Sequence, residues 1–394
     1  MRRAVPALLA LALLTAGCAS GGVVPATTTT STPATTQPPT TLATTTTRPP
    51  TTSTTTTRPP TTTTTAPVDV PALARAVLMV GLAGEGIDEA TAAHLAAGGR
   101  SLILFDANIG SAGQVRSLTQ EAACAADGPV LIAVDQELGV VARLRGLVTP
   151  LPSTAEALEM TPLDLELTGQ LLGDEMLALG INMDLAPVLD VVPLISPALI
   201  GRNLGSDPEV VAELGTAFLR GVEQAGVVAV PKHFPGHGRA VTDPHAQAAL
   251  VTASRDDLEA TDFVPFEAAF AAGARAVMVG HPVYSALDAD HPASLSPVIL
   301  DLLRDEFGFE GVAVTDSLTM AAVAAGRTPG ELAVAALVAG EDLLLFPDPA
   351  VVETIVAAIV AAVATGDLTL ARLQEAAERV RALAAAAAPV ACGG

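Results

Sequence analysis

The feature that most constrains the fold is a repeated alternation of short aliphatic runs with longer helical patterns, such as 163–179, 208–223, 262–272 and 329–339. Alternation of this kind is typical of α/β folds with parallel strands. Eight such units predict a single-domain (β/α)8 TIM-type barrel, with its site at the carboxyl ends of the strands. A doubly wound open sheet is the alternative, although no glycine-rich nucleotide-binding motif follows the first run. The eight expected strands are residues 77–82, 101–105, 130–134, 182–185, 227–230, 276–279, 312–315 and 342–346.

Residues 1–18 have the pattern of an export signal. Arg2 and Arg3 precede an apolar run, 7–14, that is too short to span a bilayer. The following sequence LTAGC resembles a bacterial lipobox, which implies that Cys18 is lipidated and becomes the mature N-terminus. An ordinary cleaved secretory signal is the alternative.

Residues 19–67 are a low-complexity segment dominated by threonine and proline. Such side chains offer too little apolar surface to offset the entropy of ordering. We expect a disordered linker that is extended by its prolines and suited to O-glycosylation at its threonines. A linker without function is the alternative. Directly after a lipobox, this segment is expected to act as a tether that holds a folded body away from a membrane, within the cell wall.

Residues 68–394 are expected to form the barrel domain, with an Ala-rich helical tail, 351–388, packed on its outside. The formal net charge of −22 argues against nucleic-acid binding, because phosphate recognition needs a positive surface. The same charge gives no attraction to anionic lipid headgroups, so the lipid anchor alone would reach the membrane. We expect a monomer. Cys124 and Cys392 could pair, but their distance cannot be judged from the sequence, and free or buried thiols are the favoured expectation.

Polar side chains gather just after the expected strands, and in a barrel these positions meet at one mouth. The plain structural role of such a carboxylate is to cap a helix or pair with arginine, and Glu137 and Asp190 fit that role. His237 lies between two glycines, where bracing the loop and acting on a substrate are equally open. The candidates are Asp135, Glu137, Asp190, Arg202, Lys232, His233, His237, Asp243, His245, His281 and Asp316.

Lys232 is the single lysine of a chain that otherwise uses arginine, and it precedes His233. The lysine ammonium is a compact charge with rotatable donors, which suits hydroxyl and carbonyl oxygens. Sugar recognition needs such donors together with carboxylate acceptors, set around a ring that carries hydroxyls on every side. The candidate set therefore favours a carbohydrate site.

Metal and serine chemistry are weaker interpretations of the same residues. His233 and His237 are four residues apart, but Pro235 and Gly236 break any helix that would place both on one face. The H-E-x-x-H and G-x-S-x-G motifs are both absent from the sequence. We therefore expect neither a metal nor another cofactor.

The run 232–238 (KHFPGHG), followed by DPH at 243–245, resembles the signature of glycoside hydrolase family 3 β-N-acetylhexosaminidases of the NagZ type. Further segments match the family in order and approximate spacing over about residues 70–350. These segments are 132–136 (IAVDQ), 185–191 (LAPVLDV), 201–208 (GRNLGSDP) and 311–320 (GVAVTDSLTM).

The resemblance implies a retaining mechanism through a covalent glycosyl-enzyme. The nucleophile would be Asp316, and the general acid/base would be His245, oriented by Asp243. A histidine titrates near neutrality, so it can protonate the leaving oxygen and later deprotonate water. The resemblance also implies sugar-binding roles for Asp135, Arg143, Arg202, Lys232 and His233.

The chain departs from the family pattern at three places. Where D-Q-E-G-G-R is usual, Leu138 and Val140 replace a Gly and the Arg. Because Arg143 is kept, we expect this change to affect the rim of the pocket more than the chemistry. Where D-S-H is usual, Pro244 restricts the backbone of that loop. Ser317 stands where Asp or Ala is common, and we expect no effect from it.

The sequence thus predicts a cell-surface lipoprotein, an exo-acting retaining β-N-acetylglucosaminidase that releases terminal GlcNAc from β-1,4-linked peptidoglycan fragments. A β-glucosidase-like member of family 3 is one alternative, and the D-x-H loop argues against it. A non-catalytic wall-binding lipoprotein is another, favoured only by Leu138, Val140 and Pro244. The natural aglycone, other GlcNAc-containing glycans included, and the choice between water and phosphate as acceptor stay open.

Overall fold

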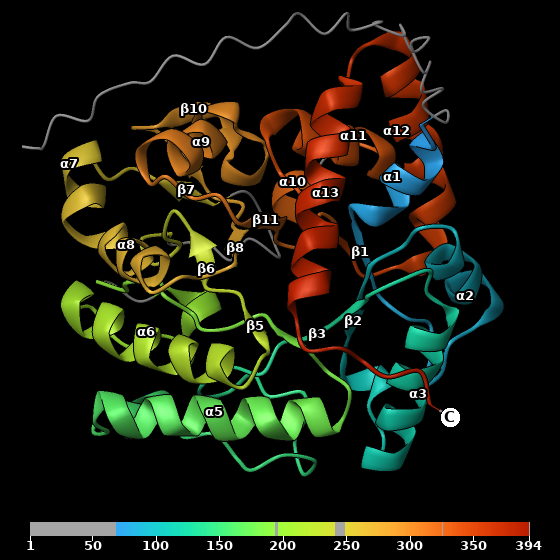
Figure 1. Ribbon diagram of the computed structural model, residues 1–394. Helices are drawn as coiled ribbons and strands as arrows, with labels where there is room; N and C mark the ends of the chain where they lie inside the picture. Colours follow the sequence, from blue (N-terminus) through green and yellow to red (C-terminus); the bar gives the residue numbers. More distant parts are fainter. Residues whose placement is uncertain (1–67, 194–195, 241–248, 325, 394) are drawn as a thin grey trace, which may run out of the picture. The chain divides into compact units, whose positions relative to one another are not determined.

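Parallel strands form the framework of the computed structural model, which describes residues 68–193, 196–240, 249–324 and 326–393 (Figure 1). One sheet has the order β12-β1-β2-β3-β4-β5, and a second has the order β11-β8-β6. All pairings within these two sheets are parallel, so the α/β class predicted from the sequence is confirmed. The strands are β1 (Leu78–Val80), β2 (Ser101–Leu104), β3 (Leu131–Val134), β4 (Met183–Asp184), β5 (Val228–Ala229), β6 (Lys232–Phe234), β8 (Ala276–Val279), β11 (Val312–Thr315) and β12 (Leu344–Phe346).

The two parallel sheets are linked by backbone contacts at both of their edges. Val188, just after β4, forms a parallel bridge with Lys232 of β6, and Val314 of β11 forms one with Leu343, just before β12. At the second edge the amide of Thr315 donates to the carbonyl of Leu343 at 2.9 Å.

A third, smaller sheet was not expected from the sequence. It has the order β10-β9-β7, in which β10 runs antiparallel to β9. Its strands are too short and too polar to give a clear alternating pattern, because β7 and β9 have two residues each and β10 reads DADHP. They are β7 (Leu250–Val251), β9 (Val283–Tyr284) and β10 (Asp288–Pro292).

Helices follow the strands, and several begin with a capping residue and a proline. The side chain of Thr161 caps α5 and that of Asp207 caps α6, and a proline comes next in each case. These two helices lie side by side (Figure 1). The α-helices are α1 (Val70–Ala76), α2 (Glu89–Ala96), α3 (Ala112–Ala125), α4 (Thr154–Ala157), α5 (Pro162–Ala178), α6 (Pro208–Gln224), α7 (Arg255–Asp257), α8 (Val264–Ala271), α9 (Pro297–Asp301), α10 (Ala321–Ala324), α11 (Pro329–Ala339), α12 (Val352–Thr365) and α13 (Leu370–Ala386). Short 3-10 or π turns are η1 (Asp106–Asn108), η2 (Pro197–Leu199), η3 (Leu258–Asp262), η4 (Ala293–Leu295), η5 (Leu302–Glu306) and η6 (Pro349–Val351).

Alternate residues along the strands bury their side chains in two separate apolar clusters. Met79 and Ile103 belong to a cluster made almost wholly of strand residues, whereas their neighbours Leu78 and Leu102 pack in the larger cluster that includes helix side chains. Both faces of the parallel strands are therefore buried, as the near-continuous hydrophobic runs of a parallel sheet require.

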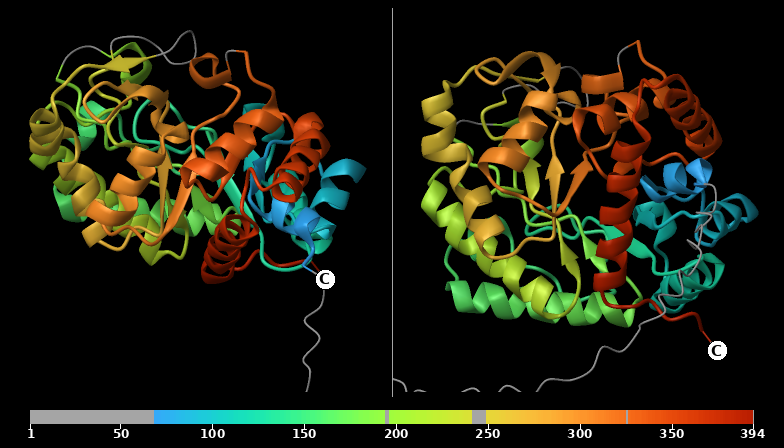
Figure 2. Two further views of the ribbon diagram at one scale, coloured as in Figure 1. Left: turned by 90° about the horizontal axis from the view of Figure 1, so that it is seen from above. Right: turned by 45° about the horizontal axis from the view of Figure 1, so that its top comes forward.

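The Ala-rich tail consists of two helices, because Gly366 ends α12 in a left-handed conformation. α13 lies against β11, α1 and α11 (Figure 2). Val380 and Leu383 of α13 join the cluster of strand residues, and the carbonyl of Ala388 accepts a hydrogen bond from Asn182, just before β4. α13 thus contacts neighbouring helices, and its last turns also pack over the starts of the strands.

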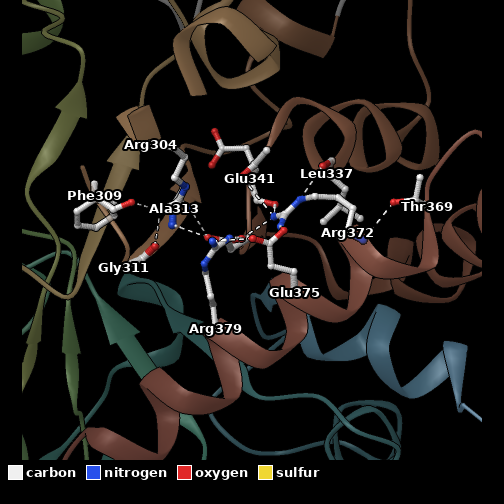
Figure 3. A network of polar contacts seen from close by, with 12 residues as sticks. Arg304, Phe309, Gly311, Ala313, Leu337, Glu341, Thr369, Arg372, Glu375 and Arg379 are labelled. Carbon is white, nitrogen blue, oxygen red and sulfur yellow. Dashed lines mark hydrogen bonds and ion pairs between the residues drawn. The ribbon is translucent and has the colours of Figure 1, made fainter. Parts of the chain in front are cut away.

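A buried carboxylate holds α13 against the strands (Figure 3). Asp342, which has no exposed surface, accepts hydrogen bonds from Arg304 at 2.6 Å, Arg372 at 2.5 Å and Arg379 at 3.2 Å. Arg304 lies in η5 and the other two arginines lie in α13. Beside them Glu341 is fully buried, and its pKa is raised well above the usual range by burial and by the charge of Asp342.

Cys124 of α3 and Cys392 form a disulfide, with Cα atoms 4.6 Å apart. The expectation of free thiols is therefore wrong for this pair. The spacing of 268 residues gave no sign of the pairing, because only the path of α13 brings the chain end back to α3. Among the helices that the structure describes, we find none with the length and apolar character needed to cross a membrane.

Candidate active site

A cavity of about 660 Å³ opens at the carboxyl ends of the parallel strands. Ile103, Leu185, Met278 and Leu345 contribute apolar wall from four different strands or strand ends. The polar residues that line it are Asp135, Glu137, Arg143, Arg202, Lys232, His233, His237, Asp316, Ser317 and Thr319.

Lys232 stands at the centre of an ion-pair network in the cavity. Its Nζ lies 2.7 Å from Oδ1 of Asp135 and 2.7 Å from Oε1 of Glu137, and its side chain is 2% exposed. Arg202 holds the same Glu137 in a two-point contact, with Nε 2.8 Å from Oε2 and Nη2 2.7 Å from Oε1. A two-point contact of this kind fixes the plane of the guanidinium relative to the plane of the carboxylate. The network therefore presents its donors in one defined orientation.

The electrostatics of this network keep Glu137 and Lys232 charged. Burial alone would raise the pKa of Glu137, but the charges of Lys232 and Arg202 outweigh it and lower the pKa to about 2. Burial alone would lower the pKa of Lys232, and the charges of Asp135 and Glu137 raise it instead. Removing a single partner therefore leaves an uncompensated buried charge.

Asp184 of β4 lies beneath this network and behaves differently. It has no exposed surface, and burial, with the nearby charges of Asp135 and Glu137, raises its pKa well above the usual range. Its Oδ1 accepts the amide of Gln136 at 2.9 Å. A protonated Asp184 would support the backbone next to Asp135 without adding negative charge to the site.

His233 is oriented by a second buried carboxylate. Its Nδ1 lies 2.7 Å from Oδ2 of Asp190, which has no exposed surface. Oδ1 of Asp190 accepts the backbone amides of His233 at 3.2 Å and His237 at 2.7 Å. A proton held on Nδ1 by the carboxylate leaves Nε2 as the nitrogen available to a ligand.

Asp316 follows β11 and lines the same cavity. Burial would raise its pKa, but the nearby His281 and His233, the amide of Ser317 and the charge of Lys232 lower it to about 2. The amide of Ser317 donates to Oδ1 at 2.7 Å, and His281 Nε2 contacts the carbonyl of Ser317 at 2.9 Å. Asp316 is therefore an ionised carboxylate at neutral pH that accepts the backbone amide of Ser317.

Arg143 reaches the edge of the cavity, where it pairs with Asp106. Its Nη1 lies 2.6 Å from Oδ2 of Asp106, and its guanidinium stands 6.0 Å from the ring centre of Phe105. Phe105 and Asp106, the two partners of Arg143, follow β2 directly. The sequence analysis did not select this loop as part of the site, because no recognisable motif follows Asp106.

The structure brings six of the sequence-predicted site residues together around this cavity: Asp135, Arg143, Arg202, Lys232, His233 and Asp316. Asp243, His245 and Cys18 lie outside the described residues. Lys232 and His233 are on β6 itself, whereas the sequence analysis placed them after the fifth strand.

Glu137 and Asp190 have more specific roles than the helix cap or arginine pair expected of them. Glu137 bridges Lys232 and Arg202, and Asp190 holds His233 and the loop of His237. The signal available was their place in the family segments, because Glu137 directly follows 132–136 and Asp190 lies within 185–191. Asp184 was missed altogether, although an acid inside an aliphatic strand pattern was a usable sign.

The arrangement combines an ionised carboxylate with cationic and imidazole donors and a carboxylate acceptor around a hollow of saccharide size. Such a set can bind hydroxyls from several directions while Asp316 faces the same space. Among the described residues, no group of three or more His, Cys, Asp and Glu side chains is arranged to hold a metal ion.

Comparisons with known proteins point to one family. Residues 84–383 match the glycosyl hydrolase family 3 N terminal domain. The beta-hexosaminidase of Stenotrophomonas maltophilia (strain K279a) is 41% identical over 185 residues, which make up 46% of this chain and 54% of that protein. The chain thus spans about half the length of the first curated relatives that it matches.

Solved structures of similar fold carry related names. A glycoside hydrolase family 3 beta-N-acetylglucosaminidase from Paenibacillus sp. str. FPU-7 superposes with a TM-score of 0.78 at 33% identity, over 81% of this chain and 63% of that one. Beta-N-acetylhexosaminidase from Beutenbergia cavernae DSM 12333 superposes with a TM-score of 0.76 at 31% identity, over 82% of this chain and 100% of that one. By its match over residues 84–383, the chain belongs to glycosyl hydrolase family 3.

Proposed function

We propose that this protein is an exo-acting retaining β-N-acetylglucosaminidase. The observation that carries the proposal is Asp316, a carboxylate with a pKa of about 2 that shares one cavity with Lys232, His233 and Arg202. The names of the relatives supply the sugar, since proteins called beta-hexosaminidase and beta-N-acetylglucosaminidase are similar to this chain over much of its length.

In the proposed reaction Asp316 attacks the anomeric carbon as the bond to the leaving oxygen breaks, and His245 protonates that oxygen. In the second step His245 takes a proton from water as water displaces Asp316, so the β configuration is retained. Asp243 orients His245. Lys232 and Arg202 donate to sugar oxygens, whereas Asp135 and the Nε2 of His233 accept from sugar hydroxyls.

The test compares Asp316→Ala and Asp316→Asn with wild type on an aryl β-GlcNAc. Both variants are expected to lose at least roughly 1,000-fold in kcat, because the nucleophile is gone. Asp301→Asn is the control, because Asp301 is exposed and lies at the end of α9. Proton NMR of the wild-type reaction should show the β anomer of GlcNAc first. Turnover of Asp316→Ala at the wild-type rate, or an α anomer as first product, contradicts the assignment.

We further propose that the natural substrates are peptidoglycan fragments with a terminal β-1,4-linked GlcNAc. The proposed cell-wall location and the N-acetylhexosaminidase names of the relatives support it. Incubation with defined muropeptides, followed by mass analysis of what is released, tests it. Release of GlcNAc from chitobiose but from no muropeptide would contradict this substrate.

We propose that the protein is an exported monomeric lipoprotein, anchored through Cys18 and tethered by residues 19–67. The disulfide between Cys124 and Cys392 supports export, because disulfides persist mainly outside the reducing cytosol. In detergent phase separation the full chain should enter the detergent phase and Cys18→Ser should stay in the aqueous phase. Equal partitioning of the two contradicts the anchor, and light scattering of the released body checks its mass.

We propose that the parallel strands close into one (β/α)8 barrel of a single domain, with β5 and β6 as two parts of one barrel strand. The bridges of Val188 to Lys232 and of Val314 to Leu343 support closure. The amides of Leu189 and Thr315 donate across these two contacts. Hydrogen exchange at both amides should be as slow as at Ile103 in β2, and fast exchange at either one contradicts closure.

A further inference from the structure

His237 is a buried polar residue of the cavity, and its ring centre lies 5.8 Å from that of His233. It is 4% exposed and lines the cavity, yet neither Nδ1 nor Nε2 has a hydrogen-bond partner in the part of the chain that the structure describes. Folded proteins leave few buried polar groups unpaired, and each such group needs an explanation. The ring lines the cavity of the proposed site, so a bound saccharide is the expected source of its hydrogen-bond partners.

The backbone around His237 fixes where the ring stands. Its amide donates to Asp190 at 2.7 Å, and the carbonyl of Gly236 accepts from the hydroxyl of Tyr284 at 2.9 Å. Gly236 has a φ of +125°, which favours glycine, and a Cβ on Gly238 would overlap the carbonyl oxygen of Val191. A turn held at these points presents the imidazole before any ligand arrives, which is how a binding group is preorganised.

The chemistry of this ring differs from that of its neighbours. Burial lowers the pKa of His237 to about 4; the charge of Asp190 opposes this shift and that of His233 adds to it, so the imidazole is neutral at pH 6 and above. A neutral imidazole offers one donor and one acceptor, whereas the cations of the cavity only donate and its carboxylates only accept. Sugar hydroxyls and the acetamido group also offer both.

We propose that His237 is a substrate-contacting residue, whose neutral imidazole exchanges hydrogen bonds with a hydroxyl or the acetamido group of the saccharide in the cavity. The inference rests on the proposed function, because it adds a binding residue to that same site. His233 cannot take this place, since its Nδ1 is committed to Asp190 at 2.7 Å.

The chain offers a matched control in His94 of α2. This histidine is 3% exposed, both of its ring nitrogens lack a partner among the described residues, and burial lowers its pKa to about 4 as well. It lines a different cavity, of about 150 Å³, together with Thr91 and Glu353. His94 therefore reproduces the burial, the unpaired nitrogens and the neutral state of His237, but it lies away from the proposed site.

The experiment compares His237→Phe, His237→Asn and His94→Phe with wild type in the full chain. The readouts are kcat and KM on aryl β-GlcNAc and aryl β-glucoside, GlcNAc affinity by calorimetry, and Tm.

His237→Phe should weaken GlcNAc binding and kcat/KM on aryl β-GlcNAc by roughly 10-fold or more, the usual effect of losing one or two ligand hydrogen bonds. Its Tm should stay equal or rise, because it removes buried polar atoms that were unpaired. His237→Asn, which keeps a donor and an acceptor, should recover part of the loss, and His94→Phe should bind and turn over GlcNAc substrates as wild type does.

The outcomes separate this inference from the proposed function. If wild type hydrolyses aryl β-GlcNAc and His237→Phe matches it in KM, kcat and GlcNAc affinity, the inference is wrong and the enzyme assignment stands. If both Phe variants lose the same activity together with Tm, the effect is structural and the inference is again wrong. If wild type neither cleaves aryl β-GlcNAc nor binds GlcNAc, the proposed function fails. If His237→Phe loses the same activity on aryl β-glucoside as on aryl β-GlcNAc, His237 contacts a hydroxyl. If only the activity on aryl β-GlcNAc is lost, His237 contacts the acetamido group.

Discussion

Nδ1 of His233 lies 2.7 Å from Oδ2 of Asp190, a carboxylate without exposed surface. The pair spans 43 residues of sequence, and it joins the segment that follows β4 to β6. Because the same carboxylate also accepts two backbone amides, Asp190 sets both the ring of His233 and the path of the loop that follows.

Replacing Asp190 by Asn should therefore impair the site without removing a residue that touches the saccharide. An amide cannot hold the proton on Nδ1 as a carboxylate does, so Nε2 loses its defined protonation state. We expect kcat/KM on aryl β-GlcNAc to fall roughly 10- to 100-fold, as is typical for partners that orient a functional histidine. Steady-state kinetics would check this, with Asp301→Asn as the exposed control. Wild-type kinetics of Asp190→Asn would show that Asp190 does not orient His233 for activity.

Glu137→Gln should destabilise the fold and change its acid sensitivity. The variant leaves Lys232 and Arg202 without their shared counter-charge, which costs about 3–5 kcal/mol in comparable buried pairs. In wild type the folded pKa is about 2, below the unfolded value, so this carboxylate stabilises the fold above pH 4.5 and loses that effect as the pH falls to 2. Tm measured from pH 5 to pH 2 should fall less steeply in Glu137→Gln than in wild type. Parallel curves would show that Glu137 does not titrate in this way.

His94→Phe should make the protein more resistant to mild acid. The folded pKa of His94 is about 4, lowered mainly by burial, so below pH 6.5 the unfolded chain takes up a proton that the folded chain does not. Wild type therefore loses stability from this residue as the pH falls from 6.5 to 4, and the variant does not. Thermal unfolding at pH 7 and pH 4.5 measures the difference. An unchanged drop in Tm between the two pH values would contradict the assignment.

Asp342→Asn should loosen α13. Three arginines share this buried carboxylate (Figure 3). Its loss removes the carboxylate that pairs with Arg304 and leaves Arg372 and Arg379 with the half-exposed Glu375. We expect a loss of about 3–5 kcal/mol in the free energy of unfolding, measured by urea titration. Glu375→Gln is the matched control, because Glu375 pairs with Arg372 and Arg379 but is half exposed, and such pairs contribute about 0.2–1 kcal/mol. Equal effects of the two substitutions would rule out a special role for Asp342.

Because Cys124 and Cys392 form a disulfide, two fewer thiols should react with an alkylating agent in the unfolded protein before reduction than after it. The double substitution to Ser should lower the free energy of unfolding by about 2–4 kcal/mol, because the cross-link restricts the unfolded chain. Urea titration with and without reductant checks this. A reductant that shifts wild type and the double variant equally would exclude the disulfide as the cause.

Much of the fold was predictable because each parallel strand is buried on both faces. The runs 276–279 and 312–315 coincide with β8 and β11, and the capped proline start of 329–339 coincides with α11. The break between β5 and β6 was not predictable, since Pro231 made Lys232 look like the start of a loop. The third sheet was missed for a different reason, because β10 is exposed and polar and has no hydrophobic period.

The site was predictable to the extent that it lies at strand ends, which the topology brings together. The partners within it were not, because Glu137 meets Arg202 across 65 residues and Asp190 meets His233 across 43. Such pairings depend on side-chain directions that no single segment encodes. The unpaired ring of His237 is also a property of packing, and the sequence could only leave its role open.

The position of Asp342 has a consequence for how this protein can change. Asp342 lies just before β12 and Pro347 just after it, and only Pro347 borders the cavity. At about 3.3 Å per residue these two points are roughly 16 Å apart along one strand. Loops at the cavity end are thus distant from the arginine cluster that holds α13. Substitutions in these loops, made to change the selectivity of the proposed glycan site, should therefore leave the packing of α13 unchanged.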